Sequence, residues 1–261
     1  MSVLRIVLVV ALPWLSGCAE EEVQFTEIKR PGERITAAEW GAFERIVKAL
    51  PEPKLAPLAD VAMPLPQWQD ARTLPVQELV FEERRALADA WDPERVARRF
   101  ARSRSLPRLL RRERLTVEQF TSLALAIGAA MRRSKLPEDY PWEDLLQRGR
   151  GAIDALQRDQ RLFSGLPVDV RHRLLDEAVW LHRVDRAQRL REVPAENVAL
   201  VNKHADWLAE VMPQFFQSHP LDDVTDMLEE YGLPFSELAE TGRDDELRWN
   251  PAQAVIGRAA P

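Results

Sequence analysis

The chain has 261 residues, of which 46% are hydrophobic and 30% are charged, and its formal net charge is −6. This composition is typical of a globular protein and excludes an intrinsically disordered chain. The sequence contains one cysteine, Cys18, which excludes an intrachain disulfide, so the packing of secondary structure must supply the stability.

The first segment with a clear character is the N-terminus. Arg5 and the free amino group precede an apolar run over residues 6–15, which ends in Leu15-Ser16-Gly17-Cys18. A transmembrane helix needs about 20 apolar residues, so this run is too short to span a bilayer. Its length and its flanking residues are typical of an export signal.

The sequence Leu15-Ser16-Gly17-Cys18 resembles the lipobox of bacterial lipoproteins. The resemblance implies that the signal peptidase recognises Leu15, Ser16 and Gly17 and cleaves before Cys18, whose thiol then carries diacylglycerol. Membrane lipid would therefore be a partner through acylated Cys18, and the protein would lie at the periplasmic face of the cell envelope. Residue 19 is Ala rather than Asp, which by the family's sorting rule favours the outer membrane over the inner one.

The domain organisation follows from this start. We expect a signal peptide over 1–17, a lipidated tether over 18–34, a helical domain over 35–235 and a flexible tail over 236–261.

The helical domain is predicted to be all-α: a multi-helix, orthogonal or bundle-like domain of about seven to nine helices with Pro-rich connectors. Segments rich in Ala, Leu, Arg and Glu lie between the prolines, and alternating β-branched segments are nearly absent. Thr36-Ala-Ala-Glu39 and Thr116-Val-Glu-Gln119 are capping boxes that mark two helix starts. Helices are expected over about 36–50, 76–90, from 92 onward, 116–131, 141–156, 168–191, 194–213 and 218–232.

Three features of these segments predict packing. Residues 51–75 contain six prolines among many apolar residues, which favours a connector laid on the core over a polyproline II segment held out for a partner. The Ala-rich middle of the helix that follows Thr116 predicts the most buried helix. Gly149 and Gly151 lack the third glycine and the preceding strand of a dinucleotide-binding loop, so they indicate a bend or a close helix crossing.

A basic stripe is expected on the helix that begins near Asp92. Arg95, Arg98, Arg99 and Arg102 recur at helical spacing, within a run of nine arginines over residues 95–114. Such a stripe suits an anionic envelope surface or a protein partner, whereas an exported protein rarely meets nucleic acid. The other interpretation is that the stripe is a merely solvated face or pairs inside the chain, since residues 222–246 carry ten acidic residues against one arginine.

The sequence contains no recognisable catalytic motif and indicates no cofactor. His172 and Asp176 share a helix face at a spacing of four residues, and tertiary packing would have to add His204 to complete a metal site. A local ion pair is the commoner meaning of such a spacing.

The sequence therefore favours a membrane-anchored lipoprotein whose helical extracytoplasmic domain is an interaction or scaffolding module. One alternative is a cell-envelope enzyme, such as a metal-dependent hydrolase, with a site assembled from distant residues. A third is a cytoplasmic helical protein with a chance leader, for which nucleic acid would return as a partner.

Overall fold

The computed structural model describes residues 28–62, 73–103, 105–216 and 221. The predicted signal peptide, the lipobox, residues 18–27 of the tether, residues 63–72 of the connector, the helix expected over 218–232 apart from residue 221, and the tail lie outside these residues. The all-α prediction is confirmed, because the described secondary structure is helical. The α-helices are α1 (Ala37–Lys48), α2 (Ala59–Ala62), α3 (Val76–Ala90), α4 (Pro93–Phe100), α5 (Leu106–Arg112), α6 (Val117–Arg133), α7 (Trp142–Arg158), α8 (Val168–Arg191), α9 (Ala195–Lys203) and α10 (Ala205–Val211), and the short 3-10 turns are η1 (Ala56–Leu58), η2 (Phe163–Gly165) and η3 (Pro213–Phe215).

Both predicted capping boxes are present. The Glu39 backbone N–H donates to the Thr36 hydroxyl at 3.2 Å, and the Thr36 backbone N–H donates to the Glu39 carboxylate at 2.8 Å. Thr116 and Gln119 form the same reciprocal pair, at 3.1 and 2.8 Å, at the start of α6. Each box satisfies backbone donors that a helix start would leave without partners.

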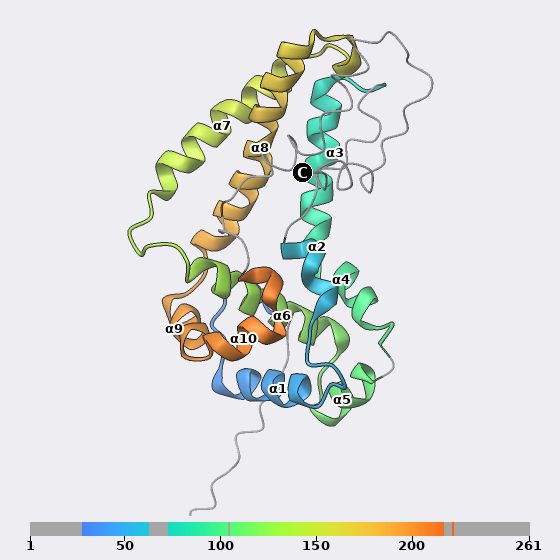
Figure 1. Ribbon diagram of the computed structural model, residues 1–261, viewed down its shortest axis with the longest axis vertical. Helices are drawn as coiled ribbons and strands as arrows, with labels where there is room; N and C mark the ends of the chain where they lie inside the picture. The colour runs from blue at the N-terminus through green and yellow to red at the C-terminus, as the bar shows by residue number, and fades with distance from the viewer. Residues whose placement is uncertain (1–27, 63–72, 104, 217–220, 222–261) are drawn as a thin grey trace, which may run out of the picture.

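The helices form two hydrophobic clusters (Figure 1). Around α6 lie α1, α2, α4, α5, α9 and α10, and we call this the α6 cluster. Helices α3, α7 and α8 extend upward from it and pack together as the α8 cluster. All residues from Phe120 to Arg132 are buried, so the prediction that this helix is the most buried is confirmed among the helices that the structure describes.

The connector packs inward as predicted, as far as it is described. Leu55, Leu58 and Val61 are buried in the α6 cluster. The Leu55 backbone N–H also donates to the Val211 carbonyl at 2.9 Å, which ties the connector to the end of α10. The connector therefore contributes to the core through these apolar residues.

The segment before α1 is fixed to two other helices. The Lys29 backbone N–H donates to the Ser122 hydroxyl of α6 at 2.9 Å. Buried Asn197 of α9 accepts from the Ile35 N–H at 2.8 Å and donates to the Glu33 carbonyl at 2.9 Å. The Lys29 ammonium lies 2.7 Å from the Glu39 carboxylate in the first turn of α1. Residues 29–35 are thus part of the fold.

The prediction of one helix over 194–213 is wrong. His204 separates α9 from α10 with a φ of −119° and a ψ of 22°, outside the helical region. Its ring packs on Trp40 of α1, with the ring centroids 4.6 Å apart. This tertiary contact accompanies a break for which the local sequence gives no signal.

Gly149 makes the close helix crossing that the glycine pair predicts. A Cβ atom at this position would lie 2.1 Å from Cγ2 of Val184 on α8 and 3.2 Å from the ring of Trp180. At Gly151, by contrast, a Cβ atom would meet nothing within 4 Å. Helix α7 runs without interruption through both glycines, so only Gly149 serves the contact with α8.

Gly149→Ala should destabilise the protein by about 1–3 kcal/mol, because the added methyl group overpacks the contact with the stiff Val184 side chain. Gly151→Ala adds the same methyl group to the same helix in open space, so it should stabilise by up to about 1 kcal/mol through helix propensity. Urea denaturation of both variants measures the difference. Equal effects of the two substitutions would contradict the close crossing at Gly149.

Candidate interaction surface and pocket

A basic surface covers the exposed sides of α4 and α5. We define it as five exposed arginines: Arg98, Arg102, Arg108, Arg111 and Arg112. Helix α4 starts at Asp92, whose carboxylate accepts the Glu94 N–H at 2.9 Å, with Pro93 at the first helical position. Val96, Ala97 and Phe100 of α4 are buried, as are Leu106 and Leu110 of α5. Helical periodicity therefore turns the arginines outward.

The carboxylate directly after α5, that of Glu113, is bound to a helix outside the basic surface. Glu113, directly after α5, accepts two hydrogen bonds from Arg45 of α1, at 3.0 and 2.7 Å, and this interaction raises the pKa of Arg45. Arg111 donates to the Pro107 carbonyl at 3.3 Å. Within the described ranges, no arginine of the basic surface forms an ion pair with a carboxylate.

One arginine of the predicted stripe, Arg95, is paired with carboxylates of the same chain. Arg95 forms ion pairs with Asp89 at the end of α3 and with Asp92, the latter at 3.7 Å. Arg98 and Arg99 are exposed on α4, while Arg102 lies in the turn after it. The acidic residues 222–246 lie outside the described part, so pairing inside the chain stays an alternative.

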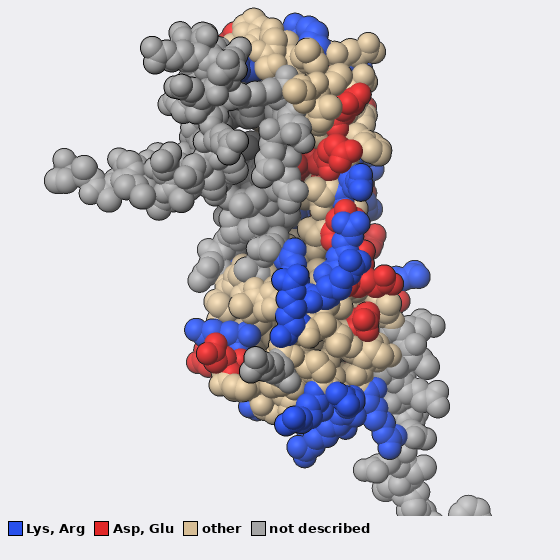
Figure 2. All heavy atoms as spheres, turned by 90° about the vertical axis from the view of Figure 1, so that its right-hand side faces the viewer, with Lys and Arg blue, Asp and Glu red and all other residues tan. Residues whose placement is uncertain are grey.

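Figure 2 views the face that carries α3, α4 and α5. Lys and Arg side chains gather at its lower end, with no Asp or Glu visible among them. Further up, along the longer helices, acidic and basic side chains alternate. Positive charge is thus concentrated at the lower end of the molecule in this view.

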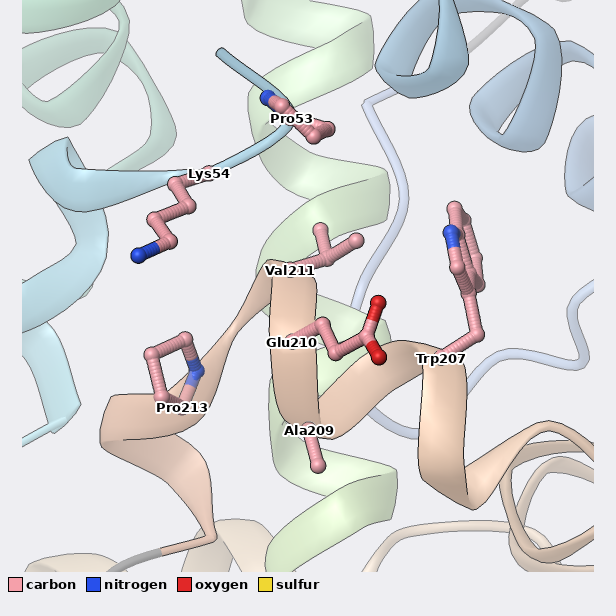
Figure 3. Close-up of a pocket in the computed structure, with 7 residues that line it drawn as sticks. All are labelled: Pro53, Lys54, Trp207, Ala209, Glu210, Val211 and Pro213. Carbon is pink, nitrogen blue, oxygen red and sulfur yellow. The ribbon is translucent and has the colours of Figure 1, made fainter.

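A pocket of about 390 Å³ lies between the connector and α10 (Figure 3). Pro53, Trp207, Val211 and Pro213 contribute apolar walls, with Ala209, and the two charged residues are Lys54 and Glu210. In Figure 3 the Lys54 ammonium and the Glu210 carboxylate extend to opposite sides. A ligand site normally has polar groups that converge, so these two residues do not define a site for chemistry.

The candidate metal ligands lie in different parts of the fold. His172 and Asp176 are exposed on α8, which belongs to the α8 cluster, whereas His204 packs on Trp40 in the α6 cluster. Among the described residues, no three His, Cys, Asp or Glu side chains come close enough to share a metal ion. The structure therefore does not bring this set together.

A buried polar pair joins α3 to α8, and the sequence did not predict it. The Glu83 carboxylate of α3 lies 2.8 Å from Nε2 of His182 on α8, and both side chains are 2% exposed. The spacing of apolar residues around Glu83 could have indicated its burial. Leu79 and Val80 lie four and three residues before Glu83, and Leu87 lies four residues after it, and all three are buried. This spacing places Glu83 on the apolar face of α3.

Comparison with known proteins gives no match to a protein-family model, to a curated protein or to a solved structure. Within the described residues, every helix is too short or too polar to cross a bilayer.

Proposed function

We propose that this protein is a bacterial lipoprotein of the cell envelope, whose helical extracytoplasmic domain acts as an interaction or scaffolding module. The observation that carries the proposal is the sequence Leu15-Ser16-Gly17-Cys18 directly after a ten-residue apolar run, in a chain with no other cysteine. Acylation of Cys18 would leave no free thiol. The well-packed helical domain that starts before α1 would then follow a short tether.

The basic surface supports the interaction part of this proposal. Its five arginines are exposed on α4, on α5 and in the turn after α4, and they carry no ion pair to a carboxylate within the described ranges. Guanidinium groups bind carboxylates and phosphates through paired hydrogen bonds, so the surface suits an anionic partner. With Ala at position 19, we place the protein at the periplasmic face of the outer membrane.

Cys18→Ala tests the anchor. In a bacterial host, the wild-type protein should start at residue 18, carry added acyl mass and remain with the membrane fraction, and density fractionation should place it in the outer membrane. Cys18→Ala should keep the mass of the full precursor, because the lipid cannot attach and cleavage does not follow. Intact mass spectrometry and membrane partition measure both effects.

Ala19→Ser is the matched control, since it changes a neighbouring small residue and keeps the thiol. It should be processed and acylated like the wild type. A wild-type protein of full precursor mass in the soluble fraction would contradict the proposed anchor.

A further inference from the structure

We propose that the basic surface on α4 and α5 is a second membrane contact, which binds the anionic headgroups of the bilayer that holds Cys18. The domain then rests on the membrane through its α5 end, with the α8 cluster directed away from the lipid. This inference rests on the proposed lipid anchor and adds an orientation and a ligand class to it.

The position of Lys29 supports this orientation. Its backbone N–H binds Ser122 of α6, and its ammonium binds Glu39 of α1. Ser122 lies six residues after Thr116, which is about 9 Å along a helix, and Thr116 follows α5 closely in the chain. The described chain therefore begins beside the same part of α6 that adjoins α5.

The length of the tether sets how far the bilayer can be from this point. Eleven residue steps separate Cys18 from Lys29, and a fully extended chain of this length spans at most about 36–40 Å. Helix α8 alone, with 24 residues, is about 36 Å long. An anchor at Cys18 therefore keeps the bilayer within reach of the α5 end and disfavours contact through the distant end of the α8 cluster.

The positive charge of the surface suits lipid phosphate, the anion that the proposed anchor brings near it. Arg98, Arg102, Arg108, Arg111 and Arg112 form no ion pair with a carboxylate within the described residues. Basic residues within a Debye length of an anionic membrane are attracted to its surface. Electrostatic attraction and a lipid chain are two signals that act together in stable membrane attachment.

The test is a proximity measurement on the acylated full-length mature protein in vesicles. Because Cys18 is the only cysteine, and acylation occupies it, one added cysteine carries a fluorophore selectively. Ala101→Cys places the label in the exposed turn after α4, and Gly151→Cys places it on exposed α7 in open space. The vesicles contain phosphatidylcholine with or without phosphatidylglycerol, and a quencher on the lipid headgroup reports the distance.

We expect the label at position 101 to be quenched about threefold more than the label at position 151 in vesicles with phosphatidylglycerol. The excess should disappear in about 1 M salt, where the Debye length falls to about 3 Å. It should also disappear in the variant Arg98→Gln, Arg102→Gln, Arg108→Gln, Arg112→Gln. The matched control removes four exposed arginines from α3 and α7, Arg84, Arg148, Arg150 and Arg158, and should keep the excess.

The outcomes separate the two proposals. Absence of acyl mass on Cys18 contradicts the anchor itself. Two results from an acylated protein would overturn the headgroup contact: equal quenching of the two labels, or identical quenching of the label at position 101 in vesicles of phosphatidylcholine alone. Either result would leave an acidic protein as the partner of the arginines. Circular dichroism of the two quadruple variants checks that both remain folded, as expected for substitutions at exposed positions.

Discussion

Phe120→Ala should lower the free energy of unfolding by about 3–5 kcal/mol, the range for removing a buried phenylalanine ring. Phe120 is fully buried at the start of α6. Its ring stacks on Phe43 of α1 and meets Phe100 of α4 edge-on, with both centroid distances 5.8 Å. The substitution therefore removes contacts with two helices at once and leaves a cavity that neither helix can fill by itself.

Phe81→Ala is the matched control for this prediction. Phe81 lies on α3 with 66% of its surface exposed, so the same change of side chain should alter stability by no more than about 0.5 kcal/mol. Urea denaturation of the wild type, Phe120→Ala and Phe81→Ala measures both effects, and we expect the three proteins to have equal m-values. A loss below about 1 kcal/mol for Phe120→Ala would contradict the central place of α6 in the core.

Glu83→Leu should destabilise the protein by about 1–3 kcal/mol, because it leaves the buried His182 imidazole without its acidic partner. Glu83 and His182 are both 2% exposed and join α3 to α8. The loss of the carboxylate therefore leaves the His182 imidazole without this partner in an apolar environment, where an unpartnered polar group is costly.

A double-mutant cycle distinguishes a coupled pair from two independent residues. Glu83→Leu with His182→Leu replaces both polar groups by apolar ones, and such replacements are often neutral. We expect the double variant to recover at least about 1 kcal/mol relative to the sum of the single losses. Additive losses would contradict a direct interaction between Glu83 and His182. Equilibrium unfolding of the four proteins at one pH provides the cycle.

Local sequence patterns predicted the parts of the fold that local interactions determine. The capping boxes at Thr36 and Thr116 involve atoms within four residues, so the sequence alone suffices to place both helix starts. The small residues of α6 predicted its burial because small side chains allow close approach from several directions. The inward packing of Leu55, Leu58 and Val61 followed from their apolar character.

Tertiary contacts determined the features that the sequence did not predict. The break at His204 accompanies packing on Trp40, more than 160 positions earlier in the chain. The neutralisation of Arg95 by Asp89 depends on the angle between α3 and α4, and the engagement of Glu113 depends on Arg45 of α1. The net charge of the basic surface could therefore not be obtained from a count of arginines along one stretch.

Residues 29–35 also determine how the fold responds to mechanical tension on the N-terminal side. Lys29 is bonded to Ser122 of α6, and Asn197 of α9 holds the backbone at Glu33 and Ile35. A pulling force on the chain before Lys29 therefore loads hydrogen bonds to α6 and α9 together with the ion pair between Lys29 and Glu39 in the first turn of α1. The tension is shared among three helices, so no single helix end carries it alone.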